Sequence, residues 1–296
     1  MNKTVIALGF FDGVHMGHGQ LLVTCRRRAR ELGCVPAALT FDTHPDSLVT
    51  GQAPPLINTP QDREWLLRNC YQMEQVLTLH FDRDMMHMPW RAFLTEILIG
   101  RYGAAHLVCG HDFRCGDRGE GTAELLKEAA AQLGVGCDIV PAYRIGGTVV
   151  SSTHIRWLLT DGLAQEAMRF LGHPHQLTGT VVQGQHLGRT LGIPTANLQI
   201  PHGIIVPKQG VYACRVWVGE QCWVAVTNVG TRPTVNGETL TVEPWLLNYQ
   251  GDLYGKEIRV EFYKYLRPER KFPSLEELKA EIHRNAQQAQ RYFFPE

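Results

Sequence analysis

The sequence predicts two domains, an α/β domain built on a parallel sheet and then an antiparallel β-barrel that ends in a helix. The length of 296 residues fits two domains of roughly 150 residues each. In the first part, short apolar runs alternate with segments of helical pattern, whereas after Pro174 β-rich segments are separated only by turns. Gly172 and Pro174 interrupt the chain where the pattern changes. We therefore expect domains at residues 1–174 and 175–296.

Strands and helices alternate in the first domain. The predicted strands are residues 5–10, 35–41, 75–79 and 106–109. The predicted helices are residues 21–32, 62–70, 90–102 and 123–133. Strands separated by helices form parallel sheets, whose ligands bind at the carboxyl ends of the strands. We therefore expect functional residues directly after these strands.

The second domain is β-rich up to its last segment. The predicted strands are residues 178–182, 210–218, 222–226, 239–243 and 258–262. Turns that contain glycine or proline separate them without an intervening helix, which indicates an antiparallel barrel. Ser274 with Glu277 three residues later forms a capping box, so we expect a final helix to begin there.

The composition argues against several classes of protein. Lys plus Arg and Asp plus Glu number 29 each, so no net charge attracts nucleic acid or an anionic membrane. No two of the eight cysteines have the two-residue gap of a zinc knuckle or a redox motif, so we expect mostly buried thiols in a reducing compartment. The apolar run near the N-terminus is too short to span a bilayer. We expect a cytoplasmic protein.

The segment from Gly9 to His18 follows the first strand and opens a helix. Such turns bind phosphate because the free backbone N–H groups and the helix dipole favour negative charge. His15 and His18 are three residues apart, so they lie on one helix face, and Gly17 between them allows close approach. Two imidazoles there can stabilise charge on an α-phosphate. Two structural histidines are the alternative.

Ser151, Ser152 and Thr153 precede a short predicted helix and offer hydroxyl and backbone donors. Arg156 adds a bidentate fork that suits a leaving pyrophosphate. A capped helix with a surface arginine would have the same pattern.

Gly184, Gly188 and Gly192 recur at four-residue intervals and precede Pro194-Thr-Ala-Asn197. The spacing differs from that of a Walker loop. A glycine flap over phosphates fits the pattern, with Thr195 and Asn197 as oxygen ligands for Mg²⁺, and so does a plain glycine-rich hairpin.

Four motifs in the first domain resemble the adenylyltransferase half of bacterial FAD synthetases, which belong to the HIGH-type nucleotidyltransferases. They are Gly9-Phe-Phe-Asp-Gly-Val-His-Met-Gly-His18, Thr40-Phe-Asp-Thr-His-Pro45, Gly110-His-Asp-Phe-Arg-Cys-Gly116 and Ser151-Ser-Thr-His-Ile-Arg156. The resemblance implies a Rossmann-like domain. It also implies that Gly9, Phe10, Asp12, Gly17 and the Ser151 segment bind ATP, and that Asp112, Phe113 and Cys115 bind flavin.

The second domain resembles riboflavin kinases. The motifs are Pro194-Thr-Ala-Asn197 with the preceding glycines, Asn228-Val-Gly-Thr-Arg-Pro-Thr234, Val242-Glu243, Asp252-Leu-Tyr-Gly255 and Leu266-Arg-Pro-Glu-Arg-Lys-Phe272. The resemblance implies a six-stranded barrel, Glu243 as the base for the ribityl 5′-hydroxyl and Arg267 as a flavin contact.

The two resemblances together imply an enzyme that uses ATP and Mg²⁺ to convert riboflavin to FMN and then FMN to FAD. The sequence departs from the family pattern at four positions: Thr43, Cys115, Trp245 and Asn248 replace a usual Pro, Phe, His and Asp. Two alternatives are a riboflavin kinase with a silent adenylyltransferase domain and a flavin-sensing or RNA-binding protein. The basic run Arg26–Arg30 is the only support for RNA binding, and a single helical run of this kind in a neutral protein is usually a solvated face. We expect small-molecule partners and neither nucleic acid nor membrane.

Overall fold

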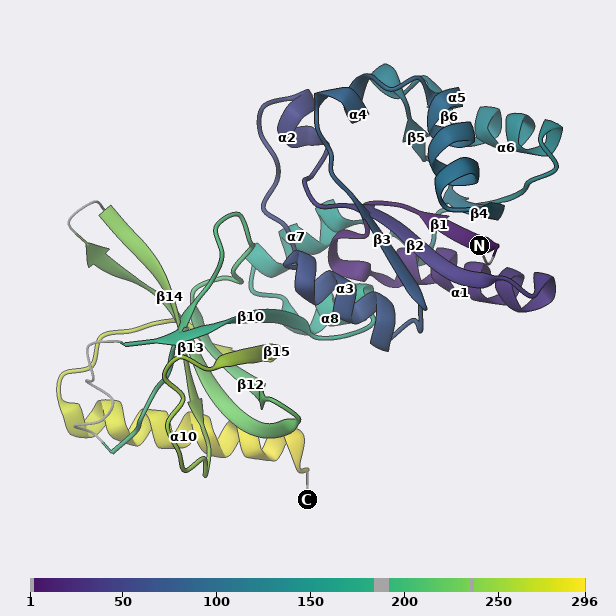
Figure 1. Ribbon diagram of the computed structural model, residues 1–296. Coiled ribbons are helices and arrows are strands. Elements are labelled where there is room, and N and C mark those ends of the chain that lie inside the picture. Colours follow the sequence, from purple (N-terminus) through teal and green to yellow (C-terminus); the bar gives the residue numbers. More distant parts are fainter. Residues whose placement is uncertain (1–2, 184–191, 235–236, 296) are drawn as a thin grey trace. The chain divides into compact units, whose positions relative to one another are not determined.

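The protein is described by a computed structural model that covers residues 3–183, 192–234 and 237–295 (Figure 1). The chain divides into two compact units. The first comprises residues 1–55 and 60–152, and the second comprises residues 56–59 and 153–296. Each unit is described by itself, and the functional boundary at residue 174 stays a prediction.

A five-stranded parallel sheet forms the centre of the first unit, as the sequence predicts. In spatial order its strands are β3 (Gln75–Leu79), β2 (Val35–Phe41), β1 (Thr4–Leu8), β4 (Ala104–Gly110) and β7 (Gly136–Val140). The order reverses beside β1, and the carboxyl ends of strands beside such a point form the usual ligand crevice of doubly wound folds. Sequence reasoning missed β7, whose five residues are only half-buried and show no clear apolar run.

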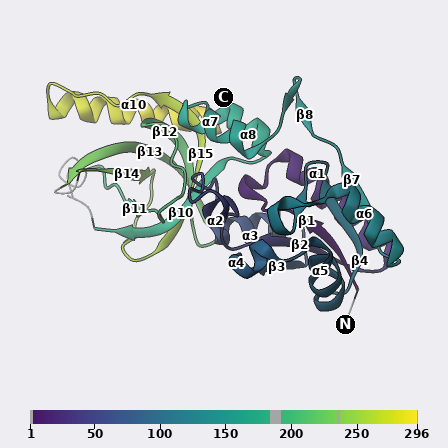
Figure 2. The same ribbon diagram turned by 90° about the horizontal axis from the view of Figure 1, so that it is seen from above.

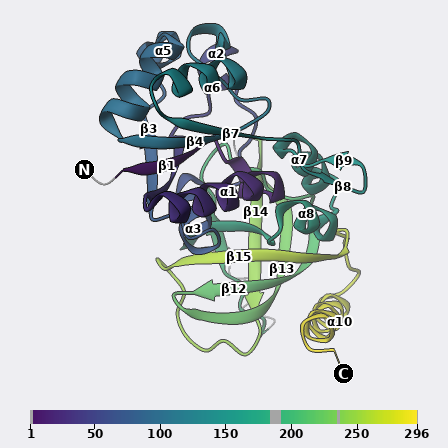
Figure 3. The same cartoon turned by 90° about the vertical axis from the view of Figure 1, so that its right-hand side faces the viewer.

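Helices cover both faces of this sheet (Figure 1). Val5 and Ala7 pack with α1 (Met16–Leu32) and α3 (Pro60–Asn69). Ile6 and Leu8 point to the other face and pack with η2 (Phe93–Arg101) and α6 (Ala123–Gln132). Figure 3 shows the same three layers edge-on. Because successive side chains of a strand point to opposite faces, the continuous apolar run of β1 follows from burial on both sides.

Short elements connect these layers. They are η1 (Asp12–Val14), α2 (Asp46–Val49), α4 (Arg83–His87), α5 (Trp90–Ala92), η3 (Asp117–Gly119) and the strand pairs β5 (Arg114–Cys115) with β6 (Gly121–Thr122) and β8 (Arg144–Ile145) with β9 (Thr148–Val149). The predicted helix 90–102 consists of α5 and a π-helical segment, η2. Residues 110–121, which include four glycines, contain the β5–β6 hairpin.

The second unit begins with α7 (Ser152–Thr160) and α8 (Ala164–Leu171) and continues into an antiparallel barrel, which confirms the predicted fold class. Its strands in spatial order are β11 (Asn197–Gln199), β10 (His175–Val182), β15 (Glu257–Arg267), β12 (Gly210–Val218), β13 (Gln221–Thr234) and β14 (Gly237–Leu246). The edge strands β11 and β14 meet where Ala196 N donates to Pro244 O at 2.9 Å. This contact closes the barrel.

The final helix, α10 (Leu275–Phe293), lies along the outer wall of the barrel over β12 and β13 (Figure 2). It begins as the sequence predicts, because Glu277 N donates to the Ser274 side-chain oxygen at 3.2 Å. Ala286 and Ala289 pack on Val211, Ala213 and Val226 of the wall. The barrel therefore has two apolar faces, one inside and one beneath α10.

No helix among the described residues is both long enough and apolar enough to cross a bilayer. All eight cysteines are free thiols. Cys25, Cys109 and Cys214 are buried and the other five are half-buried or exposed, so the prediction of mostly buried thiols was too broad.

Candidate active sites

The turn after β1 carries two residues in the left-handed region of backbone space, Phe11 with φ 59° and Val14 with φ 40°. This conformation is costly for side chains with a Cβ atom, and it persists only where the surroundings hold it. Phe11 is fully buried, and Gly9 packs on its ring, where an added Cβ would lie 3.2 Å from two ring carbons. The buried packing around Phe11 therefore fixes the conformation of the turn that connects the carboxyl end of β1 to the start of α1.

His15 is the N-cap of α1 and His18 lies in its first turn. His18 N donates to His15 Nδ1 at 3.1 Å, so a neutral His15 carries its proton on Nε2. The two rings stack with centroids 3.6 Å apart and 9° between their planes. Gly17 is needed beside them, because an added Cβ would lie 3.1 Å from His15 Cε1 and 3.4 Å from Val150 O. The structure thus brings both predicted histidines together at a helix N-terminus.

His18 is held in its neutral form. Burial lowers its pKa well below the usual 6.5, and the positive charges of His15 and Arg63 lower it further. The edge of the Phe11 ring meets His18, with centroids 5.2 Å apart. A neutral imidazole remains a hydrogen-bond donor.

Arg63 is a candidate that sequence reasoning missed. It is 2% exposed, and its Nη1 and Nη2 donate to Phe10 O at 3.2 Å and to Phe41 O at 2.7 Å. Its guanidinium also lies 4.3 Å from the Phe10 ring centroid. Burial lowers its pKa to about 10, although the carboxylates of Asp12 and Asp42 oppose the shift. No sequence signal distinguishes this arginine from an exposed one on the same helix.

In the Ser151–Arg156 segment, Ser152 makes a hydrogen bond to the turn that follows β1. Ser152 Oγ donates to Asp12 O at 2.9 Å and begins α7. Ser151 and Ser152 are half-buried. Thr153, which is exposed, and Arg156, which is half-buried, belong to the second compact unit, so their roles at this site stay predictions.

The predicted flavin residues lie after the carboxyl end of β4. Asp112 has an 83% exposed side chain. Phe113 and Cys115 pack with Trp90 on the edge of the sheet core. Gly121 completes this packing, because an added Cβ would lie 2.9 Å from Cys115 Sγ and 2.5 Å from Trp90 Cβ. Burial raises the pKa of Cys115 to about 12, so it stays a thiol. The space beside Cys115 is thus occupied by Trp90.

The predicted kinase residues share one side of the barrel wall. Ala196, Leu198 and Val242 point into the barrel core. Alternation along each strand therefore turns Asn197 and Glu243 to the other side, whereas Thr195 precedes β11 and its direction stays a prediction. These residues lie beside one another, because Ala196 N bonds to Pro244 O next to Glu243.

Two of the flap glycines, Gly184 and Gly188, lie outside the described residues. Gly192 is described and has φ 71°, a conformation that favours glycine. Among the described residues, no cluster of three or more His, Cys, Asp or Glu side chains could hold a metal ion. Hydroxyl and amide oxygens such as those of Thr195 and Asn197 suit Mg²⁺, which binds through few protein ligands and substrate phosphates.

Arg267 ends β15 against α10. Its Nε donates to Asn285 Oδ1 at 3.1 Å, and its Nη1 donates to Pro268 O at 3.0 Å. The guanidinium lies 5.5 Å from the Phe272 ring centroid, and burial lowers its pKa. Arg267 therefore anchors the connection from β15 to α10, and its contact with flavin stays a prediction.

Comparisons with known proteins identify the family. Residues 1–154 match the FAD synthetase family and residues 171–293 match the riboflavin kinase family. The bifunctional riboflavin kinase/FMN adenylyltransferase of Escherichia coli strain K12 is 36% identical over 98% of this chain and 92% of its own. The chain belongs to the bifunctional riboflavin kinase/FMN adenylyltransferase family.

A second curated relative supports this assignment, and a solved structure shares the fold. The Bacillus subtilis bifunctional riboflavin kinase/FMN adenylyltransferase is 34% identical over 98% of this chain and 93% of its own. A crystal structure of a protein named macrolide-efflux protein, from Streptococcus pneumoniae, has a TM-score of 0.87 and 29% identity over 98% of this chain and 94% of its own. Both domains of the family are thus present in one chain.

Two of the four departures from the family pattern, Trp245 and Asn248, have local explanations. Trp245 packs with Val211 and Ala213 on the wall beneath α10, and its ring meets His283 at 5.8 Å between centroids. Asn248 has φ 63°, which asparagine adopts more readily than most residues. Nothing in the structure explains Thr43.

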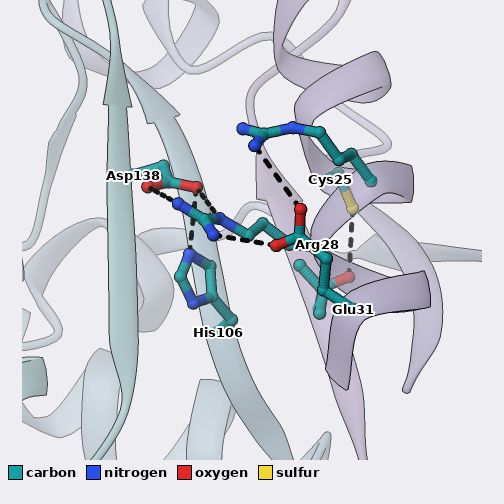
Figure 4. A network of polar contacts seen from close by, with 7 residues as sticks. Cys25, Arg28, Glu31, His106 and Asp138 are labelled. Carbon is teal, nitrogen blue, oxygen red and sulfur yellow. Dashed lines mark hydrogen bonds and ion pairs between the residues drawn. The ribbon is translucent and has the colours of Figure 1, made fainter. Parts of the chain in front are cut away.

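The basic run on α1 is engaged in ion pairs (Figure 4). Arg28 binds both carboxylate oxygens of Asp138, at 2.6 and 3.1 Å, and reaches Glu31 at 2.8 Å. His106 contacts the same Asp138 at 3.2 Å. The Arg28 hydrogen bond is the main cause of the lowered pKa of Asp138. This part of the run holds α1 to β7.

Proposed function

We propose that this chain phosphorylates riboflavin to FMN at the barrel wall and adenylylates FMN to FAD at the turn after β1, with one ATP for each step. The arrangement that carries the proposal is the stacked His15–His18 pair at the start of α1. A turn at a helix N-terminus with one buried and one half-buried imidazole suits nucleotidyl transfer, and the family match supplies the substrates.

In the kinase step, Glu243 accepts the proton of the ribityl 5′-hydroxyl while that oxygen bonds to the γ-phosphorus of ATP and ADP leaves. Asn197 begins the edge strand β11 and Thr195 lies two residues before it, and both would hold Mg²⁺, which neutralises phosphate charge when bound. The flap glycines Gly184, Gly188 and Gly192 would cover the phosphates. The hydrogen bond from Ala196 N to Pro244 O supports this assignment, because these two residues are the sequence neighbours of Asn197 and Glu243.

In the adenylylation step, a phosphate oxygen of FMN bonds to the α-phosphorus of ATP, and pyrophosphate leaves. His15 and His18 donate hydrogen bonds to the α-phosphate oxygens as negative charge builds there. The backbone of the Gly9–Gly17 turn receives the phosphates, and Arg63 keeps the ends of β1 and β2 together through Phe10 O and Phe41 O. Ser151, Ser152, Thr153 and Arg156 would hold the leaving pyrophosphate, while Asp112, Phe113 and Cys115 would line the flavin site. No covalent enzyme intermediate is needed.

We propose a cytoplasmic enzyme whose partners are ATP and flavins rather than nucleic acid. The test is incubation of the protein with riboflavin, ATP and Mg²⁺, followed by chromatographic separation of the flavins. FAD is the expected product. FMN without FAD would leave a kinase with a silent second domain, and unchanged riboflavin would contradict both activities.

A further inference from the structure

Glu269 lies in the connection between β15 and α10 and reaches back to the barrel wall. Asn228 Nδ2 donates to Glu269 Oε1 at 2.8 Å. The carboxylate sits directly over Gly230, where an added Cβ would overlap Oε1 and would lie 2.8 Å from Cδ and 3.0 Å from Oε2. Gly230 is buried and does not have a positive φ, so glycine is needed there for space and not for conformation. Because Gly230 has no side chain, the Glu269 carboxylate can pack against the barrel wall at this position.

Asn228 is the direct partner of Glu243 in the β13–β14 ladder. Val229 and Val242 point into the barrel core, so the side chains of Asn228 and Glu243 both face the opposite side. Directly opposed residues of an antiparallel pair have Cβ atoms roughly 4.5–5.5 Å apart. Glu269, Asn228 and Glu243 therefore form one row across the outer wall.

We propose that Glu269 is a positioning residue for riboflavin phosphorylation, an inference that rests on the proposed role of Glu243 as the base. An Asn side chain rotates freely about its last bond unless a partner holds it. The bond to Glu269 takes one N–H of the Asn228 amide and so fixes the orientation of the other N–H and of Oδ1. These groups lie beside Glu243, where they orient its carboxylate and the substrate hydroxyl.

The connection itself does not depend on Glu269 for its attachment. Arg267 is bonded to Asn285, and Arg270 Nη2 pairs with Glu281 Oε2 at 2.9 Å, so residues on both sides of Glu269 are tied to α10. Removal of the Glu269 carboxylate therefore releases Asn228 while the segment stays in place. A loss of activity on removal of the Glu269 carboxylate would therefore reflect the orientation of Asn228 and not detachment of the segment.

The experiment measures kcat and KM for riboflavin phosphorylation, with FMN adenylylation by the same preparation as the folding control. Glu269→Ala is expected to lower kcat about ten-fold and to change KM for riboflavin less than about two-fold, the scale of one lost orienting hydrogen bond. Glu269→Gln keeps an acceptor for Asn228 and should stay within about two-fold of the unsubstituted protein. Asn228→Ala should match Glu269→Ala. The double variant should lose no more than either single one, whereas independent effects would multiply to about a hundred-fold.

Gly230→Ala provides a second route to the same contact, since its Cβ displaces the carboxylate without altering Asn228 or Glu269. It should reproduce the kcat loss of Glu269→Ala, and Glu257→Ala, an exposed carboxylate on β15, should have no effect. An unchanged kcat in Glu269→Ala, or an equal loss in Glu269→Gln, would overturn the inference. Absence of FMN formation by the unsubstituted protein, or full activity of Glu243→Gln, would instead overturn the proposed kinase function.

Discussion

The two candidate sites differ in how far apart their residues lie in the sequence. At the turn after β1, the central residues lie within ten positions of one another, and the bond from His18 N to His15 joins residues three apart. At the barrel wall, Asn197, Asn228, Glu243 and Glu269 come from separate segments, and strand pairing or loop contacts bring them together. The first site is therefore mainly a product of local geometry, whereas the second depends on the closure of the barrel.

The largest expected effect tests whether the two sites are independent. Glu243→Gln should reduce riboflavin phosphorylation by roughly 10²–10⁴-fold, because a positioned general base contributes about that much. FMN adenylylation should be unchanged, since it uses the other site. Both rates are measured by flavin chromatography, and a loss of both activities in a folded protein would contradict the assignment of Glu243.

The converse substitution acts on the local site. His18→Ala should slow FAD formation from FMN by about 10²-fold or more, the effect of losing one donor to the transition state. FMN formation from riboflavin should continue at its normal rate. His15→Ala tests the partner, and normal FAD output from the double variant would leave both histidines with a structural role only.

A buried histidine in the barrel, His175, should make the stability of the protein sensitive to acid. His175 begins β10, is fully buried, and stacks on Phe262. Burial, with a smaller contribution from His173, lowers its pKa to about 3. The unfolded chain therefore binds a proton below pH 6.5 that the folded chain does not, so stability falls as the pH falls from 6.5 towards 3.

Replacement of His175 removes this linkage. Between pH 7 and pH 5, His175→Phe should lose about 2 kcal/mol less stability than the unsubstituted protein. Thermal unfolding at the two pH values measures the difference, and kinase activity after return to pH 7 shows whether the barrel has refolded. An equal acid loss in both proteins would mean that the ring is accessible to protons in the folded state.

The smallest expected effect concerns Cys115, where sequence and packing lead to different expectations. The family resemblance implies that Cys115→Phe restores a flavin contact and tightens FMN binding by about two- to twelve-fold. The contact with Trp90 and Gly121 leaves little room, so we expect overpacking that destabilises the protein by about 1–3 kcal/mol. FMN titration with a melting curve for each protein measures both quantities. Cys115→Ser is the control of similar size.

Local sequence was sufficient for much of the α/β unit. The apolar run of β1, the glycines after it and the histidine spacing predicted a strand, a turn and a helix, and the structure has all three, while phosphate binding at the turn stays a prediction. The helix begins at Met16 rather than Leu21, because the His15 cap extends it towards the turn. The left-handed conformations of Phe11 and Val14 had no sequence signal, since neither residue type favours them.

The amino-acid sequence by itself determined the class of each domain, the place of the turn after β1 and the capped start of α10, because apolar periodicity, turn residues and capping residues act over a few positions. Only the tertiary structure decided that Arg63 is buried, that β11 closes the barrel beside Glu243, and that Glu269 reaches Asn228 over Gly230. Each of these depends on contacts between residues far apart in the chain. A side chain's own identity does not reveal which distant backbone or carboxylate will meet it.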